Sequence, residues 1–328
     1  MSGSTAEQVV LVAPAKLNLA LLVGPQRPDG FHEIASLMVP LTLADRVVVE
    51  RTPGVGLAVE CEVAPGEQNL AAKLVHELET RLDRAFEVRV TIDKRVPAGG
   101  GLGGGSSDAA ATLLALERLY ALELSPRLRY EVAMAVGSDL PFFLWPGAQV
   151  AMGRGQVLKA VELPELRLVV AIPDLKLSTA AVYGWRDEDA EAKLGDFVPR
   201  ARLLAEKAQA AATPSDVAAL VVNDLEASVV ARRPQVGELV ARLKDAGAMA
   251  AAMTGSGAAV FGLFADEVTA EKARAALAPS RAWYVTDLQP VGARHGADAG
   301  ARRADGTGHG APGSASLADG ADNAADDR

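Results

Sequence analysis

Glycine and serine are concentrated in the stretch PAGGGLGGGSSD, which runs from Pro97 to Asp108. Six of the seven residues from Gly99 to Gly105 are glycine. Glycine lets backbone amides approach a ligand closely, and a helix N-terminus adds unpaired N–H donors that attract an anion. An apolar helical pattern follows, with Ser106, Ser107 and Asp108 placed to cap it. The stretch therefore predicts a phosphate-binding loop rather than a flexible linker.

The type of phosphate loop can be narrowed from its neighbours. No lysine follows the last glycine, so the stretch is not the GxxxxGK[ST] loop of P-loop enzymes. Gly99, Gly101 and Gly104 do match GxGxxG. A dinucleotide fold, however, needs a parallel strand after the helix with an acidic residue at its end, and the text LSPRLRYEVAMAVG has helical spacing instead. The dinucleotide interpretation therefore fails.

Two polar side chains alternate with apolar residues in PAKLNL, residues 14–19. On a strand, Lys16 and Asn18 point to the same face. An inward lysine is costly unless it has a charged partner. The segment therefore indicates either a paired lysine at a site or a solvated edge face.

Two turns bounded by glycine or proline supply further candidates. In GSDLPFF, Asp139 is either a helix or turn cap or a reactive carboxylate. In MTGSG, Gly255 precedes a strand pattern, and a plain tight turn explains it as well as a ligand loop does.

The elements that position these residues alternate between strand and helix periods. The pattern predicts strands at 9–22, broken by Pro14, at 39–52 as a strand pair, and at 86–97, 166–173, 258–264 and 282–291, with a hairpin at 147–161. It predicts helices at 69–82, 109–122, 125–137, 214–230, 235–247 and 267–278. The first part is mixed α and β, and the second places helices on a small antiparallel sheet, which together indicate an α+β class.

Composition limits the classes of protein. The chain has 328 residues, of which 49% are apolar and 23% charged, which excludes a disordered protein, a collagen or a disulfide scaffold. A net charge of −9 without a basic cluster counts against nucleic acid as a partner. Cys61 is the single cysteine, and no ligand spacing predicts a structural metal. With no signal peptide or membrane-spanning run, we expect a cytoplasmic protein without a membrane partner.

The order PAKLNL, DGFHEIASLM, PAGGGLGGGSSDAA, GSDLPFF and MTGSGAAVF resembles the GHMP small-molecule kinases over residues 9–290. NDLE, from Asn223 to Glu226, also resembles the family text. The resemblance implies a two-domain α+β fold. An ATP-binding domain, 1–160, would resemble the second domain of ribosomal protein S5, and a ferredoxin-like domain would span 161–290. Residues 291–328, rich in alanine, glycine and aspartate, are predicted to be disordered.

The resemblance also implies a role for each candidate residue. Asp139 would take the proton from a substrate hydroxyl, and Lys16 would keep Asp139 ionised and stabilise the developing charge. Mg²⁺ would accompany ATP near Ser106 or Ser107, without a protein metal cluster. The implied ATP-binding residues are Pro97, Ala98, Gly99, Gly100, Gly101, Leu102, Gly103, Gly104, Gly105, Ser106, Ser107, Asn69 and Lys94, and the implied substrate-binding residues are Asn18, Phe31, His32, Tyr183 and Gly255.

Within the family, DGFH at residues 29–32 and the doubled glycine run resemble a branch that phosphorylates the 2-hydroxyl of a cytidine diphosphate sugar alcohol. The resemblance thus implies an ATP-dependent kinase of the methylerythritol phosphate route to isoprenoids, as a monomer or homodimer. Alternatives are a kinase for another alcohol, of homoserine or mevalonate type, and a nucleotide-binding protein without turnover. The presence of both Lys16 and Asp139 favours turnover, because a binding module has no use for a base opposite the phosphate loop.

Overall fold

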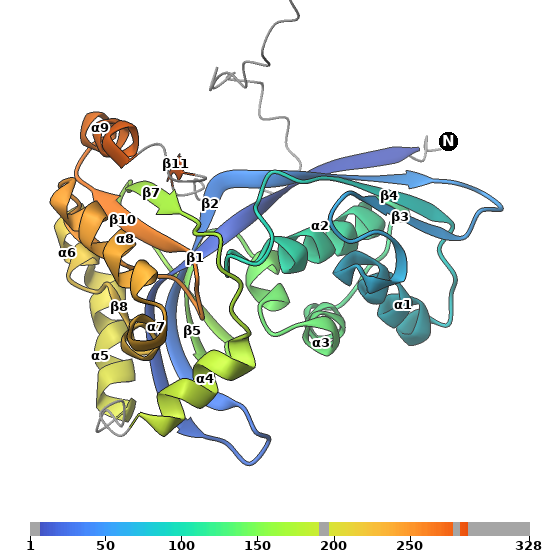
Figure 1. The fold of residues 1–328 in the computed structure, drawn as a ribbon. Helices are drawn as coiled ribbons and strands as arrows, with labels where there is room; N and C mark the ends of the chain where they lie inside the picture. Colours follow the sequence, from blue (N-terminus) through green and yellow to red (C-terminus); the bar gives the residue numbers. More distant parts are fainter. Residues whose placement is uncertain (1–6, 190–196, 278–282, 288–328) are drawn as a thin grey trace, which may run out of the picture. The chain divides into compact units, whose positions relative to one another are not determined.

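The computed structural model describes residues 7–189, 197–277 and 283–287, and all of them fall within one compact unit (Figure 1). Within these ranges no helix has the length and apolar character needed to cross a membrane. The predicted tail, 291–328, lies outside the described residues. The predicted domain boundary near residue 160 stays a prediction.

The first half of the chain builds a sheet covered by helices. In chain order its elements are β1 (Gln8–Gln26), β2 (His32–Arg51), β3 (Leu57–Cys61), a 3-10 turn (Gly66–Gln68), α1 (Leu70–Leu82), β4 (Val88–Asp93), α2 (Gly104–Leu119), α3 (Pro126–Val136), a second 3-10 turn (Leu140–Leu144), β5 (Ala148–Gly153) and β6 (Val157–Val161). Figure 1 shows α1, α2 and α3 grouped beside the strands. Leu74, Phe86 and Leu113 belong to the fully buried core between these helices and the sheet.

The second half alternates helices with short strands. Its elements are β7 (Arg167–Ala171), α4 (Thr179–Glu188), α5 (Phe197–Ala210), α6 (Pro214–Ala218), β8 (Val222–Asn223), α7 (Glu226–Arg232), α8 (Pro234–Asp245), β9 (Ala250–Met253), β10 (Val260–Phe264), α9 (Glu267–Leu277) and β11 (Trp283–Asp287). Within the described ranges, four of these strands form an antiparallel sheet in the order β11-β7-β10-β9.

The larger sheet joins the two halves. Its central path is β3-β4-β2-β1-β8, and β5 pairs with β2 and with β6. Strand β8 runs parallel to β1, so two residues from the second half extend the sheet of the first. A second core, which includes Leu17, Leu37 and Phe261, contains residues from both sheets. The observed mixture of helices and sheets confirms the α+β prediction.

Most predicted elements are present, and four predictions need correction. Pro14 does not break β1, because the ladder accommodates it with a shift of register between Pro14 and Lys16. Residues 39–51 of this predicted pair lie on the single strand β2, since the stretch lacks the glycine or asparagine of a tight hairpin turn. Helix α2 begins at Gly104, before the serines expected to cap it.

The fourth correction concerns residues 214–230, predicted as one helix. The chain leaves the helical conformation after α6 and pairs with β1 at β8 before α7 begins. Asn223 and Asp224 cause the break, because their side chains bind backbone groups elsewhere. The Asn223 Nδ2 donates to the Met253 carbonyl at 2.7 Å, and the Asp224 carboxylate accepts the Val23 N–H at 3.0 Å.

Candidate active site

The glycine-rich loop lines a pocket of about 560 Å³. All of the predicted ATP-binding residues line it except Gly100 and Ser107. Gly100 is buried toward Ile172 and Ala259, and Ser107 is fully buried in α2. Cys61, from the end of β3, and Thr179, the first residue of α4, complete different parts of the wall. The pocket has the size typical of a small-molecule site.

The start of α2 depends on Gly103. This residue is the N-cap, with a left-handed φ of +71°, and its carbonyl accepts the N–H of Ser107 at 2.9 Å. A Cβ at Gly103 would lie 2.9 Å from Phe143 Cζ, so the position has no room for a side chain. The amides of Gly104, Gly105 and Ser106 are the first of the helix and have no carbonyl partner within it. Backbone donors therefore belong to the residues that line the pocket, as a phosphate site requires.

Lys16 is held beside this loop. Its side chain is only 5% exposed, and its Nζ lies 3.5 Å from Asp139 Oδ2. The Nζ also donates to Asn18 Oδ1 at 2.6 Å, and the backbone N–H of Lys16 donates to the Leu102 carbonyl at 2.9 Å. The edge-face interpretation is therefore wrong: the lysine is buried and has a charged partner.

Asp139 does not act as a helix cap. It precedes the 3-10 turn at Leu140–Leu144, but its side chain makes no capping hydrogen bond. The side chain remains 47% exposed although it faces the buried Lys16. An ionised carboxylate in this position can reach a molecule from solvent while Lys16 balances its charge.

The turn at Gly255 belongs to the same site. With φ at +57°, a Cβ there would lie 3.2 Å from Asn18 Oδ1 and 3.6 Å from Lys16 Nζ. Thr254 Oγ1 accepts the Asn18 N–H at 2.8 Å. A turn from the second half of the chain thus packs directly on the lysine of the first. Asn18 is occupied by Lys16 and by Ser36, whose Oγ accepts from Asn18 Nδ2 at 2.7 Å, and its role toward substrate stays a prediction.

The other predicted substrate residues gather near the end of β1 and the start of β2. The rings of His32 and Tyr183 have centroids 5.1 Å apart, and His32 Nε2 lies 3.1 Å from Asp187 Oδ1. Because a carboxylate can only accept, Nε2 donates in this contact and Nδ1 is left for another partner. Burial, with the negative charge of Asp139 as a second cause, raises the pKa of Tyr183 to about 12.

Phe31 is not a core residue. Its ring is 49% exposed, and the Arg154 guanidinium carbon lies 4.7 Å from its centroid. The N–H of Phe31 donates to Asp29 Oδ1 at 3.2 Å, and this contact orders the turn that carries the ring. An exposed aromatic ring beside His32 is available for stacking on a planar ligand.

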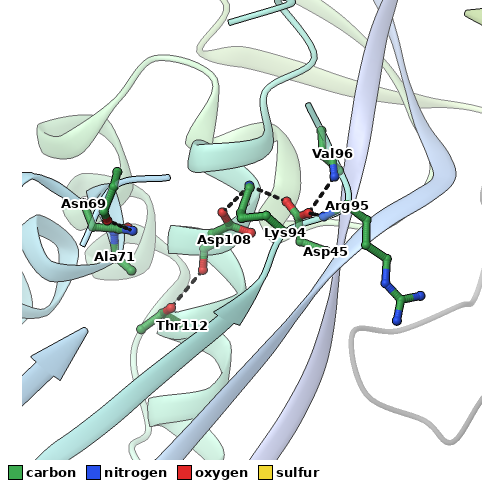
Figure 2. A network of polar contacts seen from close by, with 9 residues as sticks. Asp45, Asn69, Ala71, Lys94, Arg95, Val96, Asp108 and Thr112 are labelled. Carbon is green, nitrogen blue, oxygen red and sulfur yellow. Dashed lines mark hydrogen bonds and ion pairs between the residues drawn. The ribbon is translucent and has the colours of Figure 1, made fainter. Parts of the chain in front are cut away.

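Asn69 and Lys94 both line the pocket of the glycine-rich loop, but their polar atoms already have partners. Asn69 caps α1 by accepting the Ala71 N–H at 2.9 Å. Lys94 Nζ lies between two carboxylates, at 2.5 Å from Asp45 Oδ2 and 2.7 Å from Asp108 Oδ2 (Figure 2). Their predicted contacts with adenine stay predictions.

The two carboxylates change the acid–base properties of the network. Burial, with the charge of Asp45 adding to it, raises the pKa of Asp108 to about 7, although Lys94 works in the opposite direction. Burial alone would lower the pKa of Lys94, but the two carboxylates outweigh it and raise that pKa. Lys94 is therefore charged at neutral pH, and Asp108 changes its charge there.

Several residues of the site were not singled out from the sequence. Asp45, Asp187, Thr254 and Glu226 each hold a predicted residue or its turn in place. Glu226 Oε2 accepts the Met253 N–H at 2.6 Å, which fixes the strand before Gly255. The NDLE text, noted only as a resemblance, contains two of the anchors of this turn. Thr254 lies in the MTGSG turn, but no local pattern marks Asp45 or Asp187, because their partners are distant in sequence.

Family models of the GHMP kinases match the chain twice: the N terminal domain at residues 69–147 and the C terminal model at residues 192–281. A 4-diphosphocytidyl-2-C-methyl-D-erythritol kinase of Anaeromyxobacter dehalogenans is 43% identical over 280 residues, which cover 82% of this chain and 85% of the relative.

Solved structures agree with these matches. A crystal structure of 4-(cytidine 5'-diphospho)-2C-methyl-D-erythritol kinase superposes with a TM-score of 0.74 at 34% identity, covering 86% of this chain and 100% of that one. The homoserine kinase of Cytophaga hutchinsonii has a TM-score of 0.68 at 15% identity, covering 88% and 97% of the two chains. The second likeness is one of fold alone.

Proposed function

The chain belongs to the GHMP kinase family, and on that premise we propose that it transfers the γ-phosphoryl group of ATP to the 2-hydroxyl of 4-diphosphocytidyl-2-C-methyl-D-erythritol. This reaction is a step of the methylerythritol phosphate route to isoprenoid precursors. The observation that carries the proposal is the pair of buried Lys16 and half-exposed Asp139 beside the glycine loop. We propose the cytoplasm as its location.

Phosphoryl transfer requires positioning and charge stabilisation more than covalent help from the protein. The first-turn amides of α2 and the preceding glycines would hold the ATP phosphates in the pocket. Mg²⁺, bound with ATP, would neutralise phosphate charge; of the two predicted serines, Ser106 lines the pocket and Ser107 does not. Mg²⁺ keeps most of its ligands as waters and phosphate oxygens, so a single hydroxyl fits its needs. Within the described ranges, no group of three His, Cys, Asp or Glu residues could hold a metal.

Asp139 is proposed to accept the proton of the 2-hydroxyl as that oxygen attacks the γ-phosphorus. Lys16, 3.5 Å from that carboxylate, stabilises the charge that develops on the transferred group. Asn18 holds the ammonium in place through its Oδ1, and Gly255 allows the second-half turn to approach it. Side chains from distant parts of the sequence thus orient one acid–base pair.

The cytidine end of the substrate is proposed to lie at His32, Tyr183 and Phe31. His32 is buried and its ring is oriented by Asp187, so its remaining nitrogen can bind one edge of a cytosine. The exposed Phe31 ring and the Tyr183 ring offer faces for stacking. Tyr183 also lies close enough to Asp139 for the carboxylate to contribute to its raised pKa, so the proposed base site and the proposed catalytic pair belong to one site.

The proposal is tested by assaying ADP formation with three acceptors: the cytidine diphosphate alcohol, homoserine and mevalonate. We expect turnover with the first acceptor only. Phosphorus NMR of the product should show that the new phosphate is on the 2-oxygen. Faster turnover with homoserine or mevalonate would replace the proposed substrate. Binding of ATP without turnover of any acceptor would favour the non-catalytic alternative. A preparation of Asp139→Asn controls for contaminating kinases.

A further inference from the structure

The two ends of the glycine loop are joined by a polar network that the proposed reaction does not use. At the entry of the loop, Asp45 Oδ1 on β2 accepts the backbone N–H groups of Arg95 at 2.5 Å and Val96 at 2.7 Å. At the exit, Asp108 lies in the second turn of α2, where its carbonyl accepts from Thr112 Oγ1. Lys94 Nζ connects the two carboxylates. Figure 2 shows the three side chains meeting at this ammonium.

The network is largely buried. The side chains of Asp45 and Asp108 are 0% and 3% exposed, and that of Lys94 is 12% exposed. A buried carboxylate is costly without a partner, so each aspartate depends on Lys94. The network also touches the loop itself, because a Cβ on Gly104 would lie 3.1 Å from Lys94 Nζ and 3.1 Å from Val96 Cγ1. The ammonium is therefore packed against the first residue of α2.

This arrangement leaves Lys94 little freedom to recognise a base. Two short charge-assisted contacts already hold its Nζ, and breaking either would strand a buried carboxylate. Gly104, against which the ammonium packs, and Val96 both line the pocket, and they belong to the phosphate loop and the residues just before it.

We infer that Asp45, Lys94 and Asp108 are positioning residues that connect the two ends of the glycine loop, an arrangement called the clasp below. The clasp sets the affinity for the triphosphate and does not recognise adenine. The inference rests on the proposed ATP site but not on the identity of the acceptor. It deepens the proposed function by giving the predicted Lys94 contact a different role.

The experiment measures binding of Mg–AMP-PNP and of adenosine by calorimetry to the whole chain. In Lys94→Met the clasp is lost, and we expect AMP-PNP affinity to fall about tenfold or more, in line with the loss of charge-assisted contacts. Adenosine, which carries no phosphates, should bind as tightly as to the unaltered chain. At saturating ATP, kcat should stay within about threefold of normal while KM for ATP rises, since the reacting groups are untouched.

A second variant covers the case in which Lys94→Met does not fold. Asp45→Asn keeps an oxygen for the backbone N–H groups but removes the charge that holds Lys94, so AMP-PNP affinity should again fall severalfold. Lys94→Arg, which can still bridge two carboxylates, should recover part of the affinity. Glu117→Gln is the matched control. At the other end of α2, Glu117 Oε1 lies 2.7 Å from Arg129 Nη2, and loss of this ion pair should leave nucleotide affinity unchanged.

The outcomes separate this inference from its rivals. Unchanged AMP-PNP affinity in Asp45→Asn would overturn the clasp. An equal loss of adenosine and AMP-PNP affinity in Lys94→Met would mean that Lys94 contacts the base, and would overturn it as well. Lower melting temperatures with unchanged affinities would reduce the network to a stabilising role and would also overturn it. Failure of the unaltered chain to bind AMP-PNP would overturn both proposals. Normal binding without turnover of the cytidine substrate would overturn only the proposed function.

Discussion

The buried Lys16 and the partly buried Lys94 flank the glycine loop, and they differ in the exposure of their carboxylate partners. Lys16 faces Asp139, whose side chain is 47% exposed. Lys94 faces Asp45 and Asp108, whose side chains are 0% and 3% exposed. A half-exposed carboxylate can meet a substrate hydroxyl directly, whereas carboxylates with almost no exposed surface are suited to holding their neighbours. The same pairing of lysine and aspartate therefore suits chemistry in one place and positioning in the other.

The largest effect on turnover is expected when Lys16, the partner of the half-exposed Asp139, is replaced. Lys16→Met should lower kcat by about a hundredfold or more, because Asp139 loses the partner that faces it and the transferred group loses a stabilising charge. The double variant with Asp139→Asn should be less than additive, since both residues act on one proton and one charge. Steady-state kinetics of the two single variants and the double variant check this. Fully additive losses would separate the two residues.

A smaller loss is expected when the base of the substrate is changed. Replacing cytosine by uracil turns the exocyclic amine into a carbonyl and adds a proton to the ring nitrogen N3, which leaves buried partners unpaired at His32. Such a mismatch costs several kcal/mol, so kcat/KM should fall by about a hundredfold. Competition between the cytidine and uridine substrates measures the ratio. Equal efficiency would move base recognition away from His32 and Tyr183.

The buried network of Asp45, Lys94 and Asp108 should make the free energy of unfolding depend on pH. The folded-state pKa of Asp108 is raised to about 7 from an ordinary value of 3.8. Between these values the folded state binds more protons than the unfolded one, so the free energy of unfolding falls as pH rises through this window. Asp108→Asn removes this loss. The melting temperature of the variant minus that of the unaltered chain should therefore be larger at pH 8 than at pH 5.

Thermal unfolding of both proteins at the two pH values provides this measurement. The matched variant Asp93→Asn alters an exposed aspartate at the end of β4, so it should keep the pH profile of the unaltered chain. Parallel profiles of Asp108→Asn and the unaltered chain would show that Asp108 does not titrate in this window.

The smallest perturbation is a chemical probe of the pocket. Cys61 is the single cysteine of the chain and lines the pocket of the glycine-rich loop. Bound ATP should therefore slow its reaction with a thiol reagent by about tenfold, because the ligand covers this wall. The rate of labelling with and without Mg–ATP is the measurement. An unchanged rate would place the nucleotide elsewhere in the pocket.

Much of the site was predictable because its residue types are unusual in their local settings. A run of glycines before a helical pattern has few explanations, and a lysine inside an apolar strand requires a partner. The predicted residues from Pro97 to Ser106, other than Gly100, do line one pocket, and Lys16 does meet Asp139. The partners that complete the arrangement were not visible. Asp45 and Lys94 are 49 residues apart, and Asn18 and Thr254 are 236 apart.

The missed elements have weak sequence patterns for physical reasons. In α4 only Val182 is fully buried, so its apolar face has no helical period to detect. The strand β9 reads AAAM, and alanine has no preference for strands; pairing with β10 places it there. Residues 222–223 look helical in sequence, but tertiary hydrogen bonds from Asn223 override that tendency. Tertiary contacts thus decide the regions where local preference is weakest.

The central claim is that an exposed carboxylate beside Lys16 performs the chemistry, and Asp139→Asn tests it most directly. The amide has nearly the shape of the carboxylate but cannot accept the hydroxyl proton. We predict that kcat, measured at saturating ATP and 4-diphosphocytidyl-2-C-methyl-D-erythritol, falls by about a hundredfold or more while Mg–AMP-PNP affinity is retained. Near-normal kcat in this variant would contradict the account.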